Sequence, residues 1–76
     1  GDKVKFGAIV ELEDTDNGKI VTYQLVGPDE SDIKQGKLSI TSPVARALVG
    51  KEVGDEVRVQ APGGVRNYEV CDVRWG

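Results

Sequence analysis

The sequence predicts an α+β domain in which a largely antiparallel sheet of about five strands packs on one short helix. Three observations predict this class. Apolar and polar residues alternate in several short stretches, turn residues separate those stretches, and residues 42–50 carry both a helix start and a helix stop. The chain has 76 residues. This length suits a single domain over residues 1–76, in which about 60% of the unfolded surface is buried on folding.

A hairpin is expected first. Apolar residues occupy every second position from Val4 to Leu12, which predicts a half-buried strand with Phe6 facing the core. Residues 14–18 read Asp-Thr-Asp-Asn-Gly, and such short polar residues followed by glycine favour a tight turn. Residues 19–26 alternate again and form the second strand of the hairpin.

The middle of the chain contains the helix. Residues 28–36 are polar and irregular, with Ile33 as their apolar anchor, and a short strand follows around Leu38. Ser42 can cap a helix over residues 43–49, with a proline at its first position and a left-handed glycine after its end. The helix places four residues on an apolar stripe, namely Val44, Ala45, Leu48 and Val49, and leaves Arg46 outside it.

Two further strands complete the sheet. Residues 57–60 alternate, Ala61-Pro62-Gly63-Gly64 reads as a hairpin turn, and residues 65–75 form the last strand. In that strand Tyr68 and Val70 share one parity, whereas Val73 and Trp75 share the other. An extra residue around Cys71-Asp72 lets all four face the core, so we expect a β-bulge there.

Composition excludes several kinds of site. The net charge of −3 and the pI of about 4.8 argue against direct binding to a phosphate backbone. The chain has no His and a single Cys, so we expect no zinc site, no cofactor and no nucleophile with an evident base, and therefore no enzyme. The lone Cys71 fits a reducing, cytoplasmic setting. No apolar run of about 18 residues is present, so no membrane partner is expected.

Several short motifs occur in a fixed order. They are Phe6-Gly7-Ala8, Val26-Gly27-Pro28-Asp29-Glu30, Asp32-Ile33-Lys34, Gly36-Lys37-Leu38-Ser39, residues 42–55 and Ala61-Pro62-Gly63-Gly64. Together they make the chain, from about Val4 to Trp75, resemble the C-terminal domain of the bacterial Gre transcript cleavage factors. The resemblance implies an FKBP-like fold, a twisted antiparallel sheet wrapped on one helix.

The resemblance also implies a function. In the Gre family this domain docks on a coiled coil of the largest subunit of RNA polymerase, near the secondary channel. An N-terminal coiled coil carries acidic residues that help hold a catalytic magnesium and stimulate cleavage of backtracked RNA. The present sequence has no heptad pattern. We therefore expect a monomeric domain that binds polymerase without stimulating cleavage.

The family's docking surface includes the corner before the helix, which here means Thr41, Ser42, Pro43 and Arg46. Some members carry Asp at the position of Thr41, so a charged contact is not carried over there. Capping alone explains Ser42, and a solvated charge is the simpler interpretation of Arg46.

Three other functions stay open on the resemblance. Gre-like polymerase inhibitors and the regulator of nucleoside diphosphate kinase share this domain. The FKBP-like fold also raises a prolyl isomerase. That activity requires an aromatic-lined pocket, whereas Phe6 and Tyr23 fall in core-facing registers.

Overall fold

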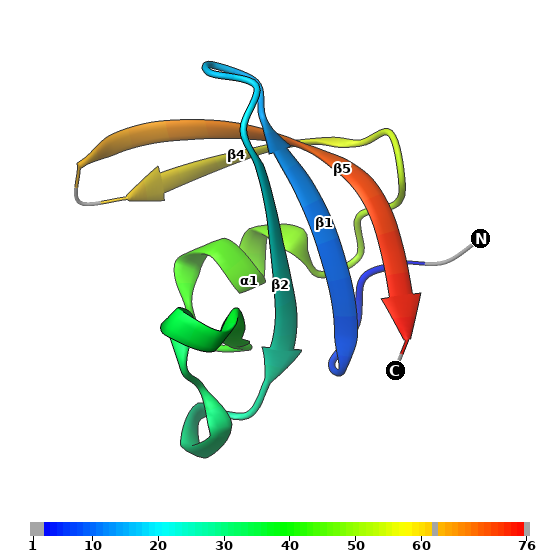
Figure 1. The fold of residues 1–76 in the computed structure, drawn as a ribbon, viewed down its shortest axis with the longest axis vertical. Helices are drawn as coiled ribbons and strands as arrows, with labels where there is room; N and C mark the ends of the chain where they lie inside the picture. The colour runs from blue at the N-terminus through cyan, green and yellow to red at the C-terminus, as the bar shows by residue number, and fades with distance from the viewer. Residues whose placement is uncertain (1–2, 62, 76) are drawn as a thin grey trace.

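A five-stranded sheet curls over one short helix in the computed structural model, which describes residues 3–61 and 63–75 (Figure 1). The strand order is β3-β2-β1-β5-β4. The elements are β1 (Ala8–Asp14), β2 (Ile20–Val26), two short 3-10 helices η1 (Pro28–Glu30) and η2 (Ile33–Gln35), β3 (Lys37–Ser39), α1 (Pro43–Leu48), β4 (Glu56–Ala61) and β5 (Gly64–Trp75). The predicted α+β class is confirmed.

The first hairpin forms as the alternation predicts. β1 and β2 pair antiparallel, with Val10 opposite Tyr23 and Leu12 opposite Val21. The Asp14 N–H donates to the Lys19 carbonyl at 2.8 Å, and Gly18 adopts a φ of 74° at the turn. Glycine is the residue that accepts this left-handed conformation without steric cost.

One strand pair differs from the expected antiparallel arrangement. β3 pairs with β2 in parallel, with Leu38 opposite Leu25 and Ser39 opposite Val26. A parallel pair requires a crossover rather than a tight turn. The segment with η1 and η2 provides it, since the Gln24 N–H donates to the Gly36 carbonyl just before β3 begins. The sheet is therefore mixed.

The predicted β-bulge in β5 is confirmed. Glu11 pairs with Asp72 while Leu12 pairs with Val70, so Cys71 is the extra residue. Val70 and Val73 are both buried as a result. The expectation for Trp75 is wrong, because its side chain is 51% exposed. β4 pairs with β5 only as far as Glu69, so among the described residues no strand pairs with the end of β5 on its outer side.

β4 and β5 pair antiparallel as far as Ala61 and Gly64. Pro62, the centre of the turn predicted at this point, lies outside the described residues. The core between the sheet and α1 is built from fully buried aliphatic side chains, the largest being Leu12, Leu25, Leu48, Val4, Val10 and Val70. α1 packs against β4 on the inner face of the sheet.

Besides Trp75, three apolar residues that were expected to pack against the core are exposed. Phe6 is 60% exposed because the chain turns from Lys5 to Ala8, with Gly7 at a φ of 89°, so that the alternation is broken before β1. Ile33 is 61% exposed on η2 and anchors nothing. Val49 has left the helical conformation, at ψ 129°, and is therefore turned off the apolar stripe.

Candidate functional site

The corner before α1 is held by main-chain bonds from the sheet. The Ile40 N–H donates to the Val26 carbonyl at 2.8 Å, which carries the chain one residue past β3. The Ser42 N–H then donates to the Ser39 carbonyl at 2.9 Å and closes a tight turn. The corner therefore starts from a fixed position at the end of β2 and β3.

Ser42 caps α1 as predicted. Its Oγ accepts a hydrogen bond from the Ala45 N–H at 3.2 Å, and its backbone is extended at φ −69° and ψ 154°. Pro43 occupies the first turn, where its missing N–H costs no helical bond. Replacing such a cap by Ala removes about 1 kcal/mol of stability.

A pair of hydroxyl groups also stiffens the chain just before Ser42. Ser39 Oγ and Thr41 Oγ1 lie 2.7 Å apart, and the Thr41 N–H donates to Ser39 Oγ at 3.2 Å. Thr41 is exposed, so its methyl group and hydroxyl remain at the surface.

The corner presents side chains outward because the helix is anchored from beneath. Ala45 and Leu48 are fully buried against the sheet. Pro43 and Arg46 lie on the opposite side and are exposed. Within residues 3–61 and 63–75, no carboxylate forms an ion pair with Arg46. The structure thus brings together the four residues selected from the sequence on one projecting turn.

The far end of α1 is tied to the start of the chain. Gly50, at a φ of 87°, reverses the direction of the chain, as its position predicts. Its N–H donates to the Val4 carbonyl at 2.9 Å, and the Val4 N–H donates to the Lys51 carbonyl at 2.8 Å. Buried Val4 therefore fixes the orientation of the helix from the side opposite to the cap.

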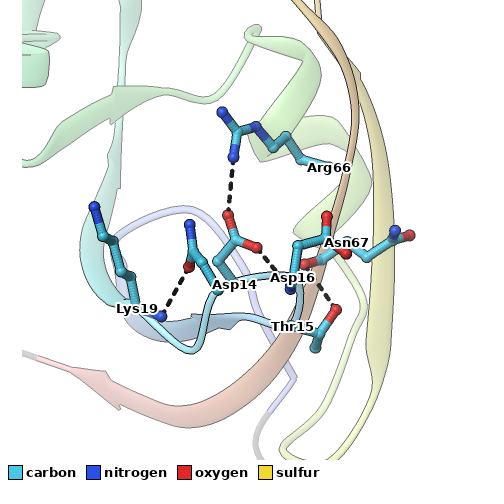
Figure 2. Close-up of polar contacts among 7 residues, drawn as sticks. Asp14, Thr15, Asp16, Lys19, Arg66 and Asn67 are labelled. Carbon is cyan, nitrogen blue, oxygen red and sulfur yellow. Dashed lines mark hydrogen bonds and ion pairs between the residues drawn. The ribbon is translucent and has the colours of Figure 1, made fainter.

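A second polar cluster lies at the opposite end of β1 (Figure 2). Asp14 is 5% exposed, and one of its carboxylate oxygens accepts from the Asp16 N–H at 2.9 Å. The other lies 3.2 Å from Arg66 Nη1. Both the N–H and the Oγ1 of Thr15 donate to the Asn67 carbonyl. This cluster fastens the β1–β2 turn to β5.

Two groups near this cluster have shifted pKa values. Burial raises the pKa of Tyr68, with further contributions from Tyr23 and Asp14, and nearby Arg66 opposes them. Burial also raises the pKa of the Cys71 thiol, helped by the carboxylates of Glu13, Glu69 and Glu11. A raised thiol pKa keeps Cys71 protonated at neutral pH, which is the opposite of an activated nucleophile.

An open hollow of about 410 Å³ lies over β4 and β5 and is lined by Thr15, Glu56, Val57, Arg58, Asn67 and Tyr68. Tyr68 is its single aromatic residue. In the described part of the chain, no three acidic or thiol side chains are grouped so as to hold a metal ion. Nor does any helix there have the length and apolar character needed to cross a membrane.

The sequence of the chain matches one family model over almost its whole length. A family model described as the C-terminal domain of the transcription elongation factors GreA and GreB matches residues 1–74. The chain belongs to this family.

Individual relatives agree with the family model. The chain is 66% identical over 73 residues to transcription elongation factor GreA of Alkalilimnicola ehrlichii, covering 96% of this chain and 46% of that protein. It is 57% identical over 76 residues to GreA of Agrobacterium fabrum, covering 48% of that protein. The chain thus spans about half the length of the curated relatives it matches.

Solved structures show the same fold. The crystal structure of the GreA factor homolog Gfh1 of Thermus thermophilus superposes with a TM-score of 0.85 at 34% identity, covering 97% of this chain and 49% of that one. GreA/GreB from Nitrosomonas europaea superposes with a TM-score of 0.79 at 30% identity, covering 95% of this chain and 60% of that one.

Exposed aromatic residues are the feature that sequence reasoning missed. Alternation alone assigned Phe6 and Trp75 to the core, yet both are more than half exposed. For Phe6, the glycine at position 7 was the available signal, because a glycine within an alternating stretch marks a turn or a bulge.

Proposed function

We propose that this domain anchors a transcription elongation factor on bacterial RNA polymerase by docking on the coiled coil of the largest subunit. The observation that carries the proposal is the family match over residues 1–74. It is supported by 66% identity to a protein named transcription elongation factor GreA.

The docking surface in this proposal is the corner formed by Thr41, Ser42, Pro43 and Arg46. Three of these residues are exposed, and the rigid cap at Ser42 limits the conformational entropy that ordering the corner on binding would cost. Arginine is enriched among the residues that dominate binding energy at protein interfaces. Arg46 forms no ion pair with a described residue, so binding breaks none.

In this proposal the domain binds but does not catalyse, and acidic residues outside residues 1–76 stimulate cleavage of backtracked RNA. The domain acts as a monomer, needs no cofactor and makes no direct contact with nucleic acid. Its setting is the cytoplasm. A net charge of −3 agrees with a protein partner rather than a phosphate backbone.

The relatives that share this domain are distinguished by similarity. Among the solved structures identity does not separate the two types, since it is 34% to Gfh1 and 30% to GreA/GreB of Nitrosomonas europaea. Identity to the curated GreA proteins is 57–66% in the examples above, and on this ground we propose that the chain belongs with the elongation factors. A prolyl isomerase is disfavoured, because Phe6 lies on an exterior turn and the hollow over β4 and β5 has one aromatic residue.

Binding of the 76-residue domain to immobilised core RNA polymerase tests the proposal. We expect saturable binding that a full-length GreA competes away, and no shortening of RNA in a backtracked elongation complex. Absence of binding at tens of micromolar domain contradicts the anchoring role. If the domain alone stimulates RNA cleavage, the proposal that it binds polymerase without stimulating cleavage is wrong.

A further inference from the structure

A large aromatic residue at the tip of a tight turn calls for an explanation. The Ala8 N–H donates to the Lys5 carbonyl at 3.0 Å, and Gly7 has a φ of 89°, so Phe6 and Gly7 are the central residues of the turn. This geometry fits a type II turn, which requires glycine at its third position and makes no demand for an aromatic residue at its second. Phe6 is 60% exposed and is therefore not explained by the fold.

The topology places Phe6 at the same end of the sheet as the docking corner. β1 begins at Ala8, whose neighbour Gly7 donates its N–H to the Leu25 carbonyl near the end of β2. The end of β2 in turn accepts from Ile40, just before the corner. β5 ends here as well, because Trp75 pairs with Ala8 (Figure 1). Trp75 is 51% exposed.

The spacing of these features suits one elongated partner. Neighbouring strands lie about 4.8 Å apart, so across the sheet the start of β1 is about 10 Å from the end of β3 and the end of β5 is about 14 Å from it. A helix with its side chains is about 10–12 Å across. A coiled coil laid across the strand ends therefore reaches the corner and both aromatic residues.

The size of a specific interface also requires residues beyond the corner. A stable complex buries about 800 Å² on each partner. Four residues of a single turn do not supply that area. Phe6 and Trp75 are the exposed aromatic residues of the described part of the chain, and the pairing of Ala8 with Trp75 puts both at this end of the sheet. Interface hot spots are enriched in Trp, Tyr and Arg, and centre on buried anchors.

Charge at this end favours an acidic partner surface. Lys3 and Lys5 are exposed beside Phe6, and Arg46 is exposed in the corner. The two ion pairs of the described residues, Arg66–Asp14 and Arg74–Asp72, use none of these cations. Three carboxylates, Asp29, Glu30 and Asp32, lie in the segment between β2 and β3, so the cations gather beside Phe6 and in the corner rather than over the whole end. Cations at an interface attract an acidic surface and speed association with it.

We infer that Phe6 and Trp75 extend the docking surface beyond the corner, and that they meet an apolar stripe flanked by acidic residues on the polymerase coiled coil. This inference rests on the proposed function. The corner fixes the register of the complex, and the two aromatic residues supply the apolar area.

The test measures binding of Phe6→Ser, Trp75→Ser and Pro43→Ala to immobilised core polymerase. Ile20→Ser is the matched control, because Ile20 is 52% exposed but begins β2 at the opposite end of the sheet. We expect Phe6→Ser to raise the Kd about tenfold or more, as at a hot spot, and Trp75→Ser to raise it severalfold, with Ile20→Ser unchanged. Binding should weaken with salt and with Lys5→Glu.

Hydroxyl-radical footprinting of the unaltered domain gives a second readout that does not depend on variant folding. The chain contains one Phe and one Trp, so oxidation of each is assigned without ambiguity. Polymerase should protect Phe6 and Trp75 but not Ile20. If Pro43→Ala weakens binding while both aromatic variants bind like the parent, the inference fails and the proposed function stands. If the parent does not bind, both fail. Protection that grows with domain concentration alone points to a second copy and overturns the inference.

Discussion

The corner before α1 and the end of the β1–β2 hairpin use the same kind of capping hydrogen bond but differ in how exposed their side chains are. In each, a short polar side chain accepts a main-chain N–H: Ser42 Oγ from Ala45, and Asp14 from Asp16. At the hairpin end the other oxygen of the Asp14 carboxylate forms an ion pair with Arg66, so the polar groups there bind one another. We call Asp14, Asp16 and Arg66 the closed cluster. At the corner the neighbouring side chains point to solvent. Capping hydrogen bonds hold both segments rigid, but only at the corner do exposed neighbouring side chains leave a surface that a partner can contact.

The largest expected effect sharpens this comparison by removing the support beneath the corner. Leu48 is fully buried. Leu48→Ala should lower the free energy of unfolding by roughly 2–5 kcal/mol, because it leaves a cavity under α1. Urea denaturation measures the loss. A loss below about 1 kcal/mol would show that the helix is not anchored through this residue.

The next effect concerns the closed cluster. Asp14→Ala should lower stability by roughly 1–3 kcal/mol, since it removes the acceptor for Asp16 and the ion pair with Arg66. Arg66→Ala should cost less than about 1 kcal/mol, because the Arg66 side chain is 55% exposed to solvent. Melting curves measure both changes. At temperatures where Asp14→Ala is folded, its affinity for polymerase should equal that of the parent, and a loss of affinity there would break the comparison.

The corner itself should respond in binding rather than in stability. Ser42→Asp should keep the fold, because aspartate caps helices as well as serine does. Its added charge and size should nevertheless weaken binding to polymerase. Pro43→Ala and Arg46→Ala should also weaken binding while changing stability by less than about 1 kcal/mol.

Thermal melts and binding titrations on the same proteins separate these two effects. Leu48→Ala is the control for stability alone. If Pro43→Ala and Arg46→Ala bind like the parent, the interface lies elsewhere, and residues 28–36 are the next segment to test.

The smallest expected effect is a loss of folding stability in alkaline solution, and it comes from two titratable residues near the closed cluster. The pKa of Tyr68 is raised above its ordinary value of 10.0, chiefly by burial. As pH rises past 10, the unfolded chain releases this proton first, so the folded state is progressively disfavoured. Tyr68→Phe should flatten that decline. Cys71, raised from 9.0, adds a decline that begins one pH unit lower and that Cys71→Ser should remove.

Local signals made much of the fold predictable. The cap at Ser42, the proline after it and the left-handed Gly50 each act within one turn of chain, so the helix start was correct and its end was placed one residue late, at Val49 instead of Leu48. The bulge at Cys71 was predictable because a single extra residue shifts the parity of every side chain beyond it.

Features that depend on distant neighbours were not predictable. β3 pairs in parallel with β2 because the segment with η1 and η2 carries the chain back alongside β2 before β3 begins. The apolar alternation within a three-residue strand carries no information about strand direction. Trp75 keeps the core-facing parity but lies beyond the described pairing with β4, which stops at Glu69 because β4 begins only at Glu56. For the corner, local residues predicted the cap at Ser42 and the exposed Arg46, whereas docking at the corner stays a prediction from family resemblance.

The shared end of β1 and β5 has a mechanical consequence. These strands are antiparallel neighbours inside the sheet, and Ala8 pairs with Trp75, so the chain enters β1 and leaves β5 at the same end of the strands (Figure 1). Tension between the two ends first breaks the two hydrogen bonds that Val4 makes with Gly50 and Lys51. It then breaks the hydrogen bonds between β1 and β5 one after another, starting at the Ala8–Trp75 pair. Heat must break the whole domain cooperatively, whereas a pull along its ends meets only a few bonds at once.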